Sequence, residues 1–138
     1  MSIQPRCSEA ELAVLEEMTA YMRAHVWVGP GRPVKRSLAL WQKLAYTLGE
    51  YRGGIDDYIY SLHSRDTLEA TIKRLPGPHS ELLQRLVNEA DETFRKATRD
   101  DGGRSLSEFL VPKANRGWWY SRRPIIGPLN TYLDAVET

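Results

Sequence analysis

SELLQRLVNEADETFRKA, residues 80–97, is the stretch of sequence that decides the fold. Apolar residues recur in it every three or four positions, at Leu82, Leu86, Ala90, Phe94 and Ala97. This spacing places them along one face of an α-helix. Ser80 can cap the start of that helix, and the run of aspartates and glycines at 100–103 ends it. The stretch therefore predicts one long helix with an apolar stripe.

Helical spacing of apolar residues also runs through the chain before this stretch. Ser8 and Glu11 have the spacing of a capping box, in which each side chain binds a free backbone N–H at a helix start. Glycines and prolines at 29–33, 53–54 and 76–78 interrupt the pattern. We expect helices over about 8–25, 34–51, 55–63 and 64–75, with Ser64 capping the last of them.

The chain after residue 98 loses the helical pattern until near its end. Ser105 and Glu108 repeat the capping-box spacing, but Pro112 limits a helix there to one or two turns. A last short helix is expected around 129–136, and the apolar runs at 26–28 and 124–126 are too short to indicate strands. The expected fold is a single all-α domain over residues 1–138. It has about five to seven helices, with an irregular aromatic and basic segment before the C-terminal helix.

Composition is that of an ordinary globular protein, with 41% hydrophobic and 27% charged residues among 138. Cys7 is the one cysteine, so no internal disulfide can form, and we expect a cytoplasmic protein. No apolar stretch approaches the roughly 20 residues of a membrane-spanning helix, and glutamates replace an apolar signal core near the N-terminus. The net charge of +1 does not by itself indicate a nucleic-acid-binding protein.

Motifs of common enzymes are missing from the sequence. It contains no GxGxxG, no Walker-type GxxxxGK[ST] and no GxSxG motif, and its three histidines do not have the spacing of zinc ligands. We therefore predict no catalytic residues, no metal site and no cofactor. A site assembled in three dimensions from Asp, Tyr and His side chains stays open as an alternative.

Three features lie between residues 46 and 73. Asp56 and Asp57 fall in the first turn of an expected helix, where the helix dipole favours carboxylates. Tyrosines at 46, 51, 58 and 60 could line a groove or could seal helix packing. Arg65, Asp66 and the Glu69–Lys73 pair are interpreted as local helix support.

A basic aromatic segment at 104–123 is the strongest candidate for a binding surface. It carries Arg104, Lys113, Arg116, Trp118, Trp119, Tyr120, Arg122 and Arg123. If the segment is extended, one tryptophan can anchor it while the other faces outward. Arginine and tryptophan are frequent interface anchors, so we expect residues 116–123 to contribute to binding more than to folding. Anchoring of the loop to the core by its aromatic residues stays open as the alternative. The candidate partner-binding residues are Asp56, Asp57, Tyr58, Tyr60, Arg116, Trp118, Trp119, Tyr120, Arg122 and Arg123.

Three stretches carry a resemblance to a known group of proteins. IDDYIYSLHSRDTLEATIKRLP (55–76), LVNEADETFRKAT (86–98) and GWWYSRRP (117–124) resemble small all-helical bacterial immunity proteins of polymorphic or contact-dependent toxin systems. The resemblance implies a protein partner, a toxin domain whose active site is blocked. Nuclease inhibitors of this kind are expected to be strongly acidic. Here, either the acidic region 54–103, with 10 acidic against 7 basic residues, makes the contact, or the toxin is not a nuclease.

A nucleic-acid-binding protein is the main alternative. In that case Trp118 or Trp119 would stack on bases, and the arginines of 104–123 would hold phosphates.

Overall fold

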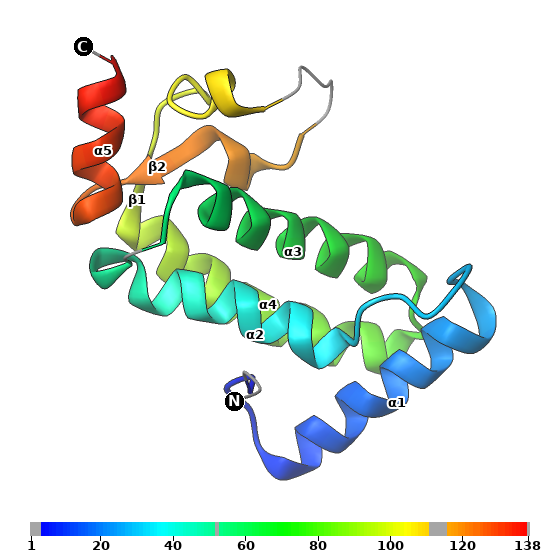
Figure 1. Cartoon of the computed structure of the whole chain (residues 1–138). Coiled ribbons are helices and arrows are strands. Elements are labelled where there is room, and N and C mark those ends of the chain that lie inside the picture. Colours follow the sequence, from blue (N-terminus) through cyan, green and yellow to red (C-terminus); the bar gives the residue numbers. More distant parts are fainter. Residues whose placement is uncertain (1–3, 52, 111–115, 138) are drawn as a thin grey trace.

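The computed structural model describes residues 4–51, 53–110 and 116–137 as a bundle of helices with a small sheet beside it (Figure 1). The α-helices are α1 (Glu9–His25), α2 (Val34–Thr47), α3 (Ile55–Arg74), α4 (Gly77–Ala97) and α5 (Pro128–Glu137). Short 3-10 helices are η1 (Leu48–Glu50), η2 (Ser107–Phe109) and η3 (Trp118–Ser121), and the strands are β1 (Thr98–Asp100) and β2 (Arg122–Pro124). The expected all-α class is confirmed. Pro112 and Lys113 lie outside the described residues.

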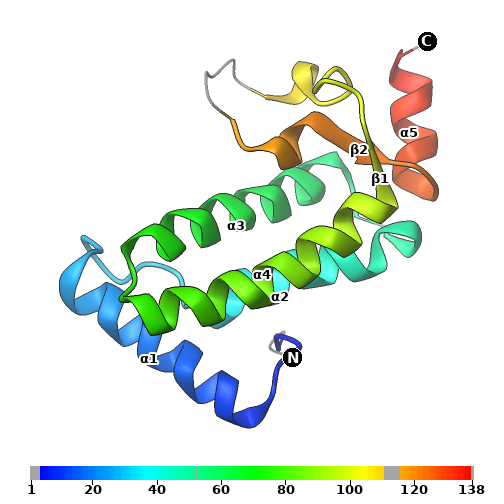
Figure 2. The same ribbon diagram turned by 180° about the vertical axis from the view of Figure 1, so that it is seen from behind.

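The hydrophobic core lies between α2, α3 and α4. Figure 1 shows α3 alongside α2, and the reverse view in Figure 2 brings α4 to the front. Trp41 of α2, Leu62 of α3 and Phe94 of α4 are fully buried. Each such side chain stabilises the fold by about 1.5–3 kcal/mol relative to its exposed state. Leu15 and Met18 of α1 join the same core.

The start of α1 has the predicted capping box. Ser8 Oγ accepts a hydrogen bond from the backbone N–H of Glu11 (3.1 Å), and the Glu11 carboxylate accepts one from the N–H of Ser8 (2.9 Å). Arg85 of α4 also donates to Glu11. The Ser8 N–H and the Arg85 guanidinium together lower the pKa of the Glu11 carboxyl.

The predicted break between 63 and 64 is wrong, because α3 continues through it as one helix. Ser64 does not cap a helix; its side chain is buried in the middle of one. At the start of α3 the N-cap residue is Gly54, and the carboxylate of Asp57, the third residue of the helix, accepts from its N–H (3.3 Å). Leu75 leaves the helical conformation because it precedes Pro76.

The long helix α4 begins earlier than predicted, at Gly77. Pro78 fits in its first turn, where no intrahelical N–H bond is required. Ser80 is therefore inside the helix, and its hydroxyl donates to the carbonyl of Ile72 (2.8 Å). The predicted stripe is buried at Leu86, Ala90 and Phe94, but Leu82 and Ala97 are only half-buried.

After the helical scaffold comes a two-stranded sheet that the sequence pattern does not predict. Strands β1 and β2 pair antiparallel, with Thr98 opposite Pro124 and Asp100 opposite Arg122. Strands of three residues are too short to show an alternating pattern. The pairing returns the chain to the end of α4.

The final helix, α5, lies beside this sheet, away from α1 (Figures 1 and 2). The turn before it rests on η1: Gly127 has a φ of 92°, and a Cβ there would lie 2.6 Å from the carbonyl oxygen of Gly49. Only glycine permits this approach. As a result α5 reaches the start of α3. None of the helices in the described ranges is long and apolar enough to cross a membrane.

Candidate functional site

The aromatic residues of the basic segment fold inward. Trp119 and Tyr120 are 4% and 3% exposed and lie in η3, not in an extended segment with alternating faces. The carboxylate of Asp66 in α3 accepts hydrogen bonds from Trp119 Nε1 (3.0 Å) and from the Tyr120 hydroxyl (2.5 Å). These two residues therefore anchor the segment to the helices, and neither presents a surface to a partner.

Beneath this anchor lies a buried ion pair between α3 and α4. Arg65 donates to both carboxylate oxygens of Asp91, at 2.9 Å each, and to Glu69 at 3.0 Å. Asp91 also accepts from Trp41 Nε1 (2.9 Å). The Arg65 guanidinium lies over the ring of Trp119, 4.3 Å from its centroid. The interpretation of Arg65 and Asp66 as local helix support is therefore incomplete, because both make contacts far along the chain.

The predicted binding role of Arg122 and Arg123 is also corrected by their surroundings. Arg123 is completely buried and donates to Ser105 Oγ, to the carbonyl and side chain of Asn130, and to Asp134 (2.7–3.1 Å). Arg122 donates to Thr98 and to the carbonyl of Arg95. The two arginines thus join α4, the sheet and α5, because buried guanidinium groups must be hydrogen-bonded.

Arg123 is consequently expected to matter for folding. The change Arg123→Ala removes a donor from Ser105 and Asn130 and should lower the free energy of unfolding by about 1 to 3 kcal/mol. Arg99→Ala is the matched control, because Arg99 is the exposed sheet partner of Arg123 and its loss should change stability by less than about 0.5 kcal/mol. Urea denaturation followed by circular dichroism measures both. Equal stability of the two variants would contradict the structural role.

Part of the basic segment remains at the surface. Trp118 is half-buried, and the Arg95 guanidinium lies 3.9 Å from the centroid of its ring. Arg116, also half-buried, lies over Tyr120 at 5.2 Å. Lys113 of the same segment lies outside the described residues.

A groove of about 480 Å³ lies between α2 and α3. Leu40 and Leu44 supply apolar lining, and Glu50, Tyr51 and Asp57 supply polar groups. A second groove of about 580 Å³ lies between the start of α3 and α5. Its lining includes Ile55, Asp56, Leu129 and Tyr132. Gly53 and Asp57 line both hollows, so the two grooves adjoin at the first turn of α3.

The four tyrosines considered in the sequence have different positions. Tyr51 and Tyr60 line the α2–α3 groove, as one of the two interpretations expected. Tyr58 is fully buried and donates from its hydroxyl to the carbonyl of Arg122 (3.3 Å), so it cannot contact a partner. Tyr46 lies beneath Arg6, whose guanidinium is 4.2 Å from its ring centroid.

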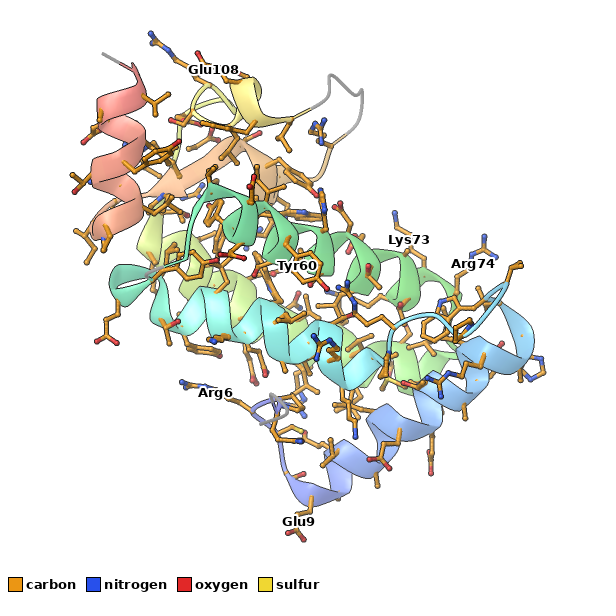
Figure 3. The ribbon with its side chains drawn as sticks, in the orientation of Figure 1. Arg6, Glu9, Tyr60, Lys73, Arg74 and Glu108 are labelled. Carbon is orange, nitrogen blue, oxygen red and sulfur yellow. The ribbon has the colours of Figure 1, made fainter. Side chains whose placement is uncertain are left out.

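Tyr60 is the most accessible aromatic residue of the α2–α3 groove. Its side chain is 43% exposed and lies between α2 and α3 (Figure 3). Arg32 donates to its hydroxyl at 2.5 Å, and the Arg32 guanidinium lies 4.8 Å from its ring centroid. Burial and the charge of Asp57 raise the pKa of Tyr51 to about 12, so this phenol is neutral at physiological pH and can donate a hydrogen bond.

Asp56 and Asp57 are both exposed, as the helix-start interpretation expected. They lie where the two grooves meet. Asp57 lines both grooves and also accepts the hydrogen bond from Gly54 at the start of α3. Within the described part of the chain, no three His, Cys, Asp or Glu side chains are grouped so that they could hold a metal ion. The arrangement offers carboxylates and aromatic rings at an open apolar hollow, which suits recognition of a basic or amphipathic group.

The chain was compared with protein-family models, with curated proteins and with solved structures, and no match was found.

Proposed function

We propose that this chain is a protein-binding module whose contact surface is the pair of adjoining grooves around the first turn of α3. The observation that carries the proposal is the shared lining at Gly53 and Asp57, which makes one hollow face from α2, α3 and α5. Exposed aromatics at Tyr60 and Tyr132 lie on this face. Aromatic side chains in apolar hollows are common centres of protein interfaces.

Charge favours a protein partner at this face over a nucleic acid. Glu50, Asp56 and Asp57 are exposed around the grooves and would repel phosphates. Arg123, by contrast, is buried and is not available to bind phosphate. The acidic region inferred from the sequence would thus make the contact, although the whole chain is nearly neutral.

In biological terms, we propose an immunity or antitoxin role in the cytoplasm: the chain binds a cognate toxin and blocks its active site. The stretch 55–76, which carries part of the resemblance to immunity proteins, includes the first turn of α3 and therefore residues of both grooves. Binding through an acidic hollow is consistent with a basic active site on the toxin.

The test begins with the partner, purified after cross-linking to the chain in its native cell. Its affinity is measured for the double variant Glu50→Lys/Asp56→Lys and for the control Glu9→Lys/Glu108→Lys, which has the same net charge. Glu9 and Glu108 are exposed and lie away from Tyr60 (Figure 3). We expect at least about a tenfold loss of affinity for the groove variant, from like-charge contact, and less than about twofold for the control.

Equal losses for the two variants would rule out this surface, since only overall charge would then matter. The toxin assignment needs a second result: the purified chain must abolish the toxic activity of the partner, and the groove variant must fail to do so at the same concentration.

The nucleic-acid alternative is favoured by one feature, the Arg95 and Trp118 contact near Arg116. It predicts binding to single-stranded DNA that weakens steeply with salt and that is lost in Trp118→Ala. If the chain binds single-stranded DNA in this way, and if Glu50→Lys/Asp56→Lys binds it with the same affinity, the nucleic-acid function replaces the protein-partner proposal.

A further inference from the structure

The chemistry of the α2–α3 groove is more specific than that of a general apolar hollow. Leu40 and Leu44 line it with apolar atoms, while Glu50 and Asp57 add carboxylates. The phenol of Tyr51 and the exposed ring of Tyr60 complete the lining. Apolar walls, carboxylates and aromatic rings together match a side chain with an aliphatic stem and a cationic end.

The same combination already holds a guanidinium elsewhere in this protein. Arg65 lies between the carboxylates of Asp91 and Glu69 and over the ring of Trp119. A planar guanidinium satisfies carboxylates along its edge and an aromatic ring with its face, which an ammonium group does less well. The buried Arg65 site thus shows which cation this set of groups accommodates.

The surroundings of Tyr60 also indicate that a guanidinium fits in this groove. Its hydroxyl and ring are in contact with the guanidinium of Arg32, which comes from the loop between α1 and α2. A guanidinium beside this ring is therefore compatible with the local geometry. Among the described lining residues the formal charges are those of Lys43, Glu50 and Asp57, so the groove carries one more negative than positive charge.

We propose that the α2–α3 groove is a subsite for an arginine side chain of the protein partner, with Glu50 and Asp57 facing its guanidinium and Tyr51 and Tyr60 flanking it. The inference rests on the proposed function, because it names the chemistry of the partner at the same surface. Two cations of this chain oppose the binding: Lys43 in the groove lining, and Arg32, which already contacts the hydroxyl and ring of Tyr60. Removing the charge of Lys43, which leaves the contacts of Tyr60 with Arg32 in place, should therefore strengthen the binding of a guanidinium.

The test uses the full chain and a defined probe, Nα-acetyl-arginine N-methylamide, in ¹H–¹⁵N correlation spectra. Its neutral isostere, the citrulline analogue, is the control. We expect saturable chemical-shift changes at the amides of Gly53, Asp57 and Ser61, with a dissociation constant in the millimolar range. The affinity for the citrulline analogue should be at least about threefold weaker, and that for the lysine analogue should be intermediate.

Variants then test the charges one at a time. Glu50→Gln and Asp57→Asn should each weaken arginine binding about two- to fivefold, the range of exposed ion pairs. Asn at position 57 keeps an oxygen to cap the helix. Lys43→Gln should strengthen binding by a similar factor, and Glu9→Gln should leave it unchanged.

Equal affinity for arginine and citrulline, or shifts away from the groove, would overturn the proposal. So would a Lys43→Gln variant that binds no more tightly. Failure of the proposed function gives a different result. If Glu50→Lys/Asp56→Lys leaves the partner's affinity unchanged while arginine still binds, the subsite exists but the interface lies elsewhere. If partner affinity falls while arginine does not bind, the interface stands and the guanidinium subsite is wrong.

Discussion

Asp91→Ala is expected to lower the free energy of unfolding by about 3 to 5 kcal/mol, because it leaves the charge of Arg65 buried without its main partner. The Arg65 and Asp91 side chains are only 4% and 5% exposed, so water cannot replace the lost contacts. The same change leaves Trp41 Nε1 without its acceptor. Chemical denaturation followed by circular dichroism measures the loss.

Two controls separate the ion pair from helix effects. Glu92→Ala removes an exposed carboxylate from the next position of α4 and should change stability by less than about 0.5 kcal/mol. The double change Arg65→Met/Asp91→Leu removes both charges together and should recover the part of the loss that comes from the unpaired charge, because an apolar pair can replace a buried ion pair. Trp41 Nε1 lacks its acceptor in both variants, so the difference between them does not include that contact. A double variant as unstable as Asp91→Ala would show that the charge itself is not responsible.

Phe94→Ala is expected to cost about 3 to 5 kcal/mol, since it opens a cavity at the centre of the core. Phe94 is fully buried, its ring centroid lies 4.7 Å from that of Trp41, and Trp118 lies 6.0 Å away on the segment that returns to the helices. The thermal midpoint of unfolding measures the effect.

Lys96→Ala, exposed on the same helix, serves as the comparison and should leave the midpoint almost unchanged. A midpoint equally unaffected by Phe94→Ala would show that this face of α4 is not packed.

Helices were predictable where local signals agreed. α1 follows its capping box at Ser8 and Glu11. α2 ends at Thr47, and the 3-10 helix η1 continues to Glu50, so the helix predicted over 34–51 is α-helical only in its first fourteen residues. Between 63 and 64 a capping residue, Ser64, suggested a boundary, although nothing in the sequence stops the helix there. Capping residues are also tolerated inside helices when their side chains find a buried partner, so this signal alone was insufficient.

The candidate surface was predictable in part. Asp56, Asp57 and Tyr60 were selected from the sequence and lie on the grooves. Glu50 and Tyr132 were not selected, because an isolated acid or tyrosine has no local pattern that marks it as a groove residue.

By itself the sequence determined the all-α class and most helix positions, because periodicity and capping act over a few neighbouring residues. Only the tertiary structure decided which arginine and aromatic side chains face inward. Arg65 meets Asp91 across 26 positions, and Trp119 meets Asp66 across 53. An arginine or tryptophan has the same local pattern whether it binds a partner protein or the interior of its own chain. Whether its side chain is buried depends on a carboxylate that folding brings to it from a distant segment.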